Sequence, residues 1–294
     1  MSAVLLQALA AGDTVRGLAA VTTDVVEEAR RRHGTLPTAT AALGRTLTAG
    51  LLLGATMKDD EKLSIELAGD GPLGRIQVDT EGGGRVRGYV AHPATHLPPK
   101  HGKLDVAGAL GSGLLCVIRT KPWEKEPYRS IMPLVSGEIA QDIAHYLVAS
   151  EQMPSAVALG VFVAGDGRTT AAGGYLVQAL NGAGAAVVAR MEANVARMPA
   201  VTTLIREGAA PLDILERALA GLGLGTPTEQ PVAFGCRCTR ERVFGALILL
   251  GADEIRDIIA TEGAAEVTCA FCAEHYVVGA EELEMLIAEP AGSA

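Results

Sequence analysis

The stretch from residue 231 to residue 276 decides how this chain is organised; it begins PVAFGCRCTRER and ends TCAFCAEHY. It holds four of the five cysteines of the chain, in a C-x-C pair and a C-x-x-C pair separated by thirty residues. The four are Cys236, Cys238, Cys269 and Cys272. Clustered thiols in a chain without a secretion signal indicate a metal site or a redox device before they indicate a disulfide framework. The spacing allows both interpretations.

Four thiolates are the usual ligand set of a structural zinc site, which is tetrahedral and leaves no position for water. Two thiols one or two residues apart chelate the metal locally, and folding brings in the second pair. The sequence therefore predicts one Zn²⁺ bound by Cys236, Cys238, Cys269 and Cys272. His275 is spaced so that it could also be a ligand, but with four sulfurs available we expect it at the surface or beside the ligands.

The free energies of the two possible states of these thiols differ widely. A domain of about 60 residues has a marginal core, and zinc binding contributes on the order of 10–16 kcal/mol. A disulfide within either pair closes a ring of a few residues and contributes roughly 1–2 kcal/mol. A C-x-C disulfide is also near the limit of acceptable Cα spacing. Oxidation would replace one strong link between distant segments by two weak local ones, so we expect the domain then to unfold.

Charged residues bear on both interpretations of the cysteines. Arg237, Arg240 and Arg242 lie beside the first pair, where they favour thiolate or balance the charge of a dianionic zinc–tetrathiolate centre. Residues 231–294 nevertheless carry four basic and eleven acidic side chains, and the whole chain has a net charge of −9. A zinc module that binds a phosphate backbone is expected to be basic. The charge therefore disfavours a nucleic-acid partner, although a structural zinc-ribbon module of a nucleic-acid-associated protein stays open as the alternative. A zinc enzyme, the third possibility, needs one cysteine released from the metal.

The rest of the chain has the pattern of apolar residues that is typical of an α+β protein. Apolar residues at helical spacing predict helices over 25–33, over 37–56 and, after Ser136 and Glu138, from 139 to about 150. Alternating segments separated by Gly-rich turns, such as LSIELAG, GRIQVDT and RVRGYVA, predict an antiparallel meander. Further strands are expected at 15–23, 113–120, 128–135, 157–165 and 171–180. Strands that bracket helices in this irregular order favour α+β over an alternating parallel array.

The spacing of apolar residues changes from a strand pattern to a helical pattern after residue 183. Two short helices are predicted at 185–198 and 211–222, and residues 221–231 look like a flexible tether. We therefore expect an N-terminal α+β domain over residues 1–183, a helical linker over 184–230 and a small C-terminal domain over 231–294. The segment between the cysteine pairs has room for two helices, at 241–250 and 252–259, and a short strand ends near Thr268.

Several other signals are weaker than the cysteine pairs. Gly69–Gly74 matches G-x-G-x-x-G as a string, but a strand pattern follows it instead of the helix that a dinucleotide site needs. We interpret the histidines of a Pro-rich loop as a solvated turn, three acidic residues on or near the helix that ends near residue 150 as a solvated face, and Cys116 as an inert core thiol. These residues are His92, His96 and His101, and Glu138, Asp142 and Glu151. No phosphate-binding loop and no catalytic motif is found, so we expect no enzyme.

The N-terminus lacks the basic region of a signal peptide, and no run of 18 apolar residues occurs. A cytoplasmic protein without a membrane partner is therefore the expectation.

The segment Cys236–Arg242, the pair Cys269 and Cys272 and the following Tyr276 resemble the redox-switch domain of the 33-kDa chaperonin family, a bacterial heat-shock holdase activated by oxidants. The resemblance extends over essentially the whole chain. Ser150–Pro154 (SEQMP) and Ala171–Gly174 (AAGG) are similar to a Ser-Glu-Gln-x-Pro turn and an Ala-Ala-Gly-Gly strand of that family.

The resemblance implies an ATP-independent chaperone that is zinc-bound and inactive when reduced. It implies that the four cysteines bind zinc and, on oxidation, form Cys236–Cys238 and Cys269–Cys272 disulfides with release of the metal. The linker then loosens, and the protein dimerises and binds unfolding client proteins. Cys116 has no counterpart role in the family. The linker of this chain is rich in Ala and Gly and carries few charges, which departs from the family.

Overall fold

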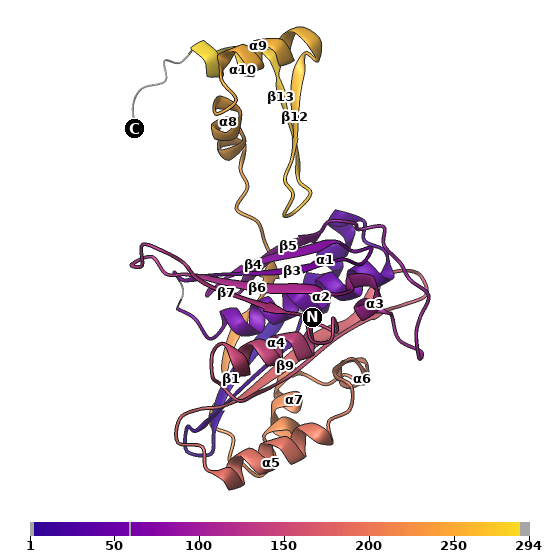
Figure 1. The fold of residues 1–294 in the computed structure, drawn as a ribbon, viewed down its shortest axis with the longest axis vertical. Coiled ribbons are helices and arrows are strands. Elements are labelled where there is room, and N and C mark those ends of the chain that lie inside the picture. The colour runs from indigo at the N-terminus through magenta and orange to yellow at the C-terminus, as the bar shows by residue number, and fades with distance from the viewer. Residues whose placement is uncertain (1–2, 59, 289–294) are drawn as a thin grey trace. The chain divides into compact units, whose positions relative to one another are not determined.

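The computed structural model describes residues 3–58 and 60–288 (Figure 1). The chain divides into two compact units, Met1–Gly235 and Cys236–Ala294. The first unit combines a five-stranded and a six-stranded sheet with helices, and the second combines a two-stranded hairpin with helices. The predicted α+β class is therefore confirmed.

The five-stranded sheet of the first unit is antiparallel, with the order β10-β1-β2-β9-β8. Its strands are β1 (Val4–Ala10), β2 (Val15–Val21), β8 (Ser155–Val163), β9 (Thr169–Ala179) and β10 (Thr228–Pro231). Strands β2 and β9 are buried along almost their whole length because helices cover both faces of the sheet. Burial on both faces explains why their sequences are nearly continuous runs of small and apolar residues without alternation.

The six-stranded sheet has the order β11-β5-β4-β3-β6-β7 and is antiparallel except for β11, which runs parallel to β5. Its strands are β3 (Lys62–Gly69), β4 (Arg75–Glu81), β5 (Arg85–Val90), β6 (Gly113–Thr120), β7 (Tyr128–Pro133) and β11 (Ala233–Phe234). Buried and partly exposed residues alternate along β3, β4 and β5, so this sheet covers the core with one face only. The predicted meander is confirmed.

Helix α2 (Pro37–Gly54) lies between the two sheets and contacts strands of both, as Figure 1 shows. Small residues make this close packing possible: a Cβ added to Gly44 would lie 2.5 Å from Cγ1 of Val26 and 2.8 Å from Cγ2 of Val161. Around it pack α1 (Thr23–His33), α3 (Val106–Leu110) and α4 (Ala140–Ala149). The main hydrophobic core of the first unit surrounds α2.

Helices α6 (Val201–Arg206) and α7 (Pro211–Ala218) pack on the five-stranded sheet, α5 (Ala185–Ala196) packs on α7, and together they enclose a second hydrophobic core. The helices predicted at 185–198 and 211–222 are confirmed with shorter ends, and α6 was not predicted. The prediction of a flexible tether over 221–231 is wrong at its end, because β10 pairs with β1 in the register Leu5↔Gln230. The edge of β1 presents unpaired backbone groups, and these bind the segment despite its polar, Pro-containing sequence.

The second unit contains α8 (Arg240–Ile248), α9 (Ala252–Thr261), the antiparallel hairpin of β12 (Ala264–Thr268) and β13 (His275–Gly279), and α10 (Ala280–Ala288). Its core is small. Within residues 236–288, the buried side chains that form this core are Val243, Leu247, Ile255, Ala265, Val278 and Leu283. The two helices and the strand that the sequence predicts between the cysteine pairs are confirmed, whereas β13 and α10 were not predicted.

The prediction of a solvated acidic face near α4 is wrong for Asp142. This side chain is buried, and its carboxylate accepts hydrogen bonds from the backbone N–H groups of Val135 (2.8 Å), Ser136 (2.9 Å) and Ile139 (2.9 Å). Asp142 therefore holds the turn before α4, a role that helical spacing alone does not reveal. The carboxylate of Glu138 pairs with Arg45 at 2.6 Å, so this residue is not a free solvated charge either.

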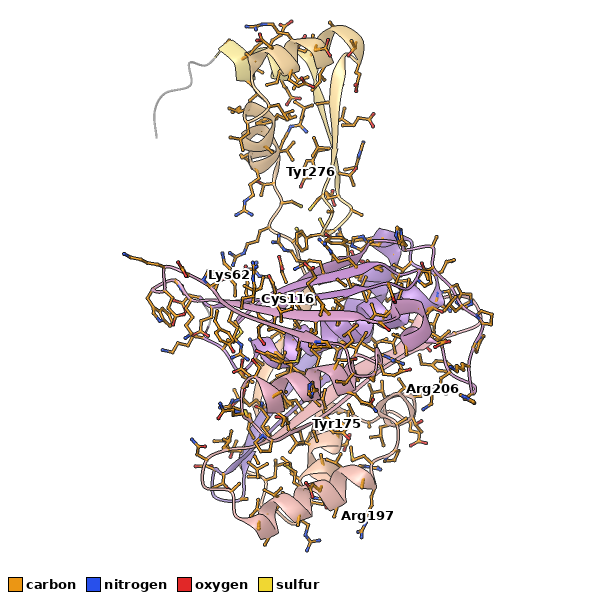
Figure 2. The ribbon with its side chains drawn as sticks, in the orientation of Figure 1. Lys62, Cys116, Tyr175, Arg197, Arg206 and Tyr276 are labelled. Carbon is orange, nitrogen blue, oxygen red and sulfur yellow. The ribbon has the colours of Figure 1, made fainter. Side chains whose placement is uncertain are left out.

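Two further sequence predictions concern isolated residues. Cys116 is half-buried on β6, on the face opposite the core residues Leu115 and Val117, so the prediction of a core thiol is wrong (Figure 2). Burial nevertheless raises the pKa of this thiol, which keeps it protonated and little reactive. The loop with His92 and His96 is exposed, as predicted for a solvated turn.

Candidate metal centre

The first pair of cysteines, Cys236 and Cys238, lies directly before helix α8. Thr239 caps this helix: its backbone is extended (φ −139°, ψ 165°), and its side-chain oxygen accepts a hydrogen bond from the backbone N–H of Arg242 at 3.4 Å. A threonine in this position is a typical N-cap. The helix start therefore determines where the C-x-C segment ends and holds it at the end of α8.

The second pair, Cys269 and Cys272, lies in the turn that joins β12 to β13. The turn is closed by backbone hydrogen bonds from Cys269 N–H to the carbonyl of Glu274 (2.9 Å) and from Ala273 N–H to the carbonyl of Cys269 (2.8 Å). Ala273 adopts the left-handed conformation, with φ of 56°. The hairpin therefore presents both sulfurs of the C-x-x-C pair at its tip.

The fold brings all four sulfurs together. Each Sγ lies within 4.8 Å of the others, and this is the one such group of potential metal ligands among residues 3–58 and 60–288. The Sγ atoms of Cys236 and Cys269 are 3.8 Å apart, and those of Cys238 and Cys272 are 3.3 Å apart. Tetrahedral coordination with Zn–S bonds of about 2.3 Å places sulfurs about 3.8 Å apart. The cluster therefore has the size and the donor set of a four-thiolate site.

Burial raises the pKa of the Cys269 and Cys272 thiols above the ordinary value of 9.0. Backbone N–H groups of the turn lower it in part: those of Phe271 and Cys272 donate to Sγ of Cys269, and that of Glu274 donates to Sγ of Cys272. A coordinated divalent cation deprotonates such thiols outright. The four residues could therefore bind a metal ion.

Tyr276 extends the centre beyond the cysteines. Its hydroxyl on β13 donates a hydrogen bond to Sγ of Cys238 at 3.3 Å, and Figure 2 labels it within the second unit. This hydrogen bond raises the pKa of Tyr276, so the hydroxyl keeps its proton. Sequence reasoning noted this tyrosine only for the family resemblance. The i+4 spacing from Cys272 does not show that its hydroxyl reaches the other pair.

Two neighbours of the cluster, Arg240 and His275, have partners of their own. Arg240 forms an ion pair with Glu282 at 2.5 Å and donates to the backbone carbonyl of Val277 at 2.9 Å, which links α8 to the second strand of the hairpin and to α10. The hydrogen bond from Arg240 lowers the pKa of Glu282. His275 is half-exposed, and its ring nitrogens lie 3.2 Å from the hydroxyl of Thr268 and 3.8 Å from the carboxylate of Glu266. It lies at the surface, as expected, and it is not in the group of four potential metal ligands.

The model of the Hsp33 protein family matches residues 4–279 of this sequence. The chain belongs to the Hsp33 family. Relatives named 33 kDa chaperonin match nearly the whole chain: that of Desulforamulus reducens is 46% identical over 98% of this chain and 98% of its own length. The relative from Acaryochloris marina is 48% identical over 98% of this chain and 97% of its own length.

A solved Hsp33 structure has the same fold. The crystal structure of the 33 kDa chaperonin of Thermotoga maritima, a heat shock protein 33 homologue, matches with a TM-score of 0.91 and 38% identity, over 97% of this chain and 98% of that one. The Hsp33 family consists of heat-shock chaperones, a non-enzymatic function. Over residues 3–58 and 60–288, no helix is long and apolar enough to cross a membrane.

Proposed function

We propose that this chain is a redox-regulated, ATP-independent holdase whose switch is the four-cysteine cluster. The observation that carries the proposal is the meeting of two cysteine pairs from separate segments, with every Sγ within 4.8 Å of the others. Such a cluster binds one metal ion when reduced, and each of its pairs is close enough in sequence to form a local disulfide when oxidised. Membership in a chaperone family supports the client-binding half of the proposal.

In the reduced state Cys236, Cys238, Cys269 and Cys272 would hold one Zn²⁺. Zinc is favoured because four thiolates form a soft, tetrahedral ligand set that leaves no site for water. When bound, the ion links the segment before α8 to the tip of the hairpin and keeps the four sulfurs deprotonated. Within residues 236–288, the hydrophobic cluster of six buried side chains is too small a core to hold these segments together strongly.

Oxidation removes the ligands. In each pair two thiolates give up two electrons to one hydrogen peroxide, which takes up two protons and leaves as two molecules of water while one S–S bond forms. The disulfides Cys236–Cys238 and Cys269–Cys272 close short rings and contribute roughly 1–2 kcal/mol each. They leave the two segments unlinked, so the second unit unfolds.

Unfolding then reaches the linker, which we place at residues 184–230 between a domain of residues 1–183 and a switch domain of residues 231–294. The division of the chain between Gly235 and Cys236 supports the second boundary to within a few residues. In the structure, the linker helices cover apolar residues of the five-stranded sheet, including Val15 and Val177. Release of α5–α7 would expose two apolar surfaces, which bind unfolding clients and join two copies into a dimer.

A light-scattering assay tests the proposal. Reduced, zinc-loaded protein and peroxide-treated protein are each mixed with a client that unfolds on heating, without ATP. We expect aggregation with the reduced sample, suppression with the oxidised sample, and release of one zinc per chain on oxidation. The matched control is Cys116→Ser, which lies outside the cluster and should switch like the wild type. Equal aggregation in the reduced and oxidised samples would refute the redox switch.

A further inference from the structure

The hydroxyl of Tyr276 joins the two halves of the cysteine cluster. Tyr276 lies on β13, four residues beyond Cys272 in the hairpin that carries the second pair. Its hydroxyl nevertheless donates to Cys238 of the first pair, 38 residues earlier in the chain and 3.3 Å away. The ring itself packs against the small core of the second unit. The ring and the hydroxyl therefore have separate roles.

We propose that Tyr276 is a positioning residue of the metal centre, whose hydroxyl holds the Cys238 sulfur in place and lowers its reactivity toward oxidants and other electrophiles. The inference rests on the proposed zinc-binding and redox function and specifies how the first pair is protected in the reduced state. It concerns Cys238 alone among the four ligands.

The physical reason is the distribution of charge on the sulfur. A hydrogen-bond donor withdraws electron density from a thiolate, which makes it a poorer nucleophile and stabilises the deprotonated form. The sulfurs of Cys269 and Cys272 receive such donors from the backbone of their own turn. Cys238 receives one from a side chain, so a substitution at Tyr276 can remove it without disturbing that turn.

The hydrogen bond from Tyr276 to Cys238 also explains how the two cysteine pairs could respond together to an oxidant. The donor to Cys238 is carried by the strand that follows Cys272, and β12 and β13 are paired over five residues. Loss of the hairpin would move Tyr276 away from Cys238 and leave that sulfur without its donor. Damage to the second pair would therefore increase the reactivity of the first, which makes the switch steeper than two independent pairs would be.

The test compares wild type, Tyr276→Phe and the control His275→Gln, all as full-length, zinc-loaded protein. His275 precedes Tyr276 on the same strand and contacts Thr268 and Glu266 instead of a sulfur. Each protein is treated with iodoacetamide, in which a cysteine sulfur displaces iodide, and modification of each cysteine is followed by mass spectrometry. We expect Tyr276→Phe to accelerate modification of Cys238 about fivefold to tenfold, with His275→Gln unchanged.

Two further measurements separate this role from a purely structural one. In the cobalt-substituted protein, loss of the hydrogen bond raises the energy of the sulfur lone pair, so Tyr276→Phe should move the sulfur-to-cobalt charge-transfer band to lower energy. Site-specific 3-fluorotyrosine at position 276 has a more acidic hydroxyl and should slow modification of Cys238. An unshifted cobalt band, or equal acceleration at Cys238, Cys269 and Cys272, would overturn the inference, and so would a 3-fluorotyrosine protein that reacts as fast as wild type.

These outcomes are separate from the failure of the proposed function. A wild-type chain that binds no zinc would overturn the metal centre, and the present inference with it, before any variant is made. A zinc-loaded wild type that never suppresses client aggregation would overturn the holdase function. A selective effect of Tyr276→Phe on Cys238 would still stand in that case.

Discussion

Substitution of Gly17 by alanine should open the linker of the reduced protein without any oxidant. Gly17 lies on β2, directly under helix α7. A Cβ at this position would lie 2.7 Å from Cδ1 of Leu219 and 3.1 Å from Cδ2 of Leu215. Ordinary carbon–carbon contacts are about 3.5–4.0 Å. The end of α7 must therefore shift outward by about 1 Å, or the leucines must leave their rotamers.

The expected magnitude follows from this overlap. Overpacking of a core typically costs about 1–3 kcal/mol. The strain acts on the contact between α7 and the sheet, so it favours the state in which residues 184–230 are released. A shift of that size raises the population of the released state by about 5- to 150-fold. The second unit and its cysteines are not touched by the substitution.

Limited proteolysis of the reduced protein measures the released population, because a protease cleaves the linker only when its helices are open. We expect cleavage within 184–230 to accelerate by the factor given above, together with partial suppression of client aggregation without peroxide. Gly165→Ala is the matched control, since a Cβ there meets nothing within 4 Å. If the protease cleaved the two sheets and the linker of Gly17→Ala at the same rate, α5–α7 would be released only when the whole first unit unfolds. That result would refute the reasoning.

Three further predictions concern the cluster and the stability of the first unit. Cys272→Ser should abolish stoichiometric zinc binding, and circular dichroism should then show the second unit unfolded. The control Cys116→Ser should retain the metal. Zinc retained by both variants would contradict the four-ligand site. Asp142→Ala should lower the free energy of unfolding by about 3–5 kcal/mol, because it leaves several buried N–H donors without their acceptor. Urea titration measures this loss. A loss of less than about 1 kcal/mol would show that water replaces the carboxylate. The pKa of Glu27 is lowered from 4.5: burial raises it, but the hydrogen bonds from Arg30 and from the backbone N–H of Thr169 outweigh that effect. Its stabilisation is therefore present above about pH 4.5 and is lost as the pH falls through the lowered folded-state pKa. Glu27→Gln should destabilise the protein at pH 7, and its difference from the wild type in the free energy of unfolding should shrink as the pH falls below about 4.5. A difference that does not shrink would refute the assignment.

Local chemistry made much of this protein predictable. The spacing of the four cysteines predicts the ligand set, and the segments they flank are the two helices and the strand expected between them. Alternation of apolar residues predicts the strands of the six-stranded sheet, because one face of that sheet is buried and the other is not. These features depend on residues close together in the chain.

The alternation of apolar and polar residues was uninformative where both faces of an element are buried. It was also uninformative where the unpaired backbone groups at a sheet edge determine which strands pair. Strand β1 has no strong alternation, and β10 is polar, yet they pair because each satisfies the backbone groups of the other. Asp142 carries a charge on an amphipathic helix, where a solvated position is the usual expectation. It is buried because the preceding turn supplies backbone N–H groups as partners.

The sequence by itself therefore determined the α+β class, the helices and strands with a clear period, and which four cysteines form the cluster, since each follows from chemistry within a few residues. Tertiary structure alone decided that α2 lies between two sheets, that β10 closes on β1 and that the Tyr276 hydroxyl reaches Cys238. Those contacts join residues far apart in the chain, and their geometry depends on how the elements pack. A periodic pattern shows which residues are apolar, but it does not show which distant hydroxyl will lie 3.3 Å from a sulfur.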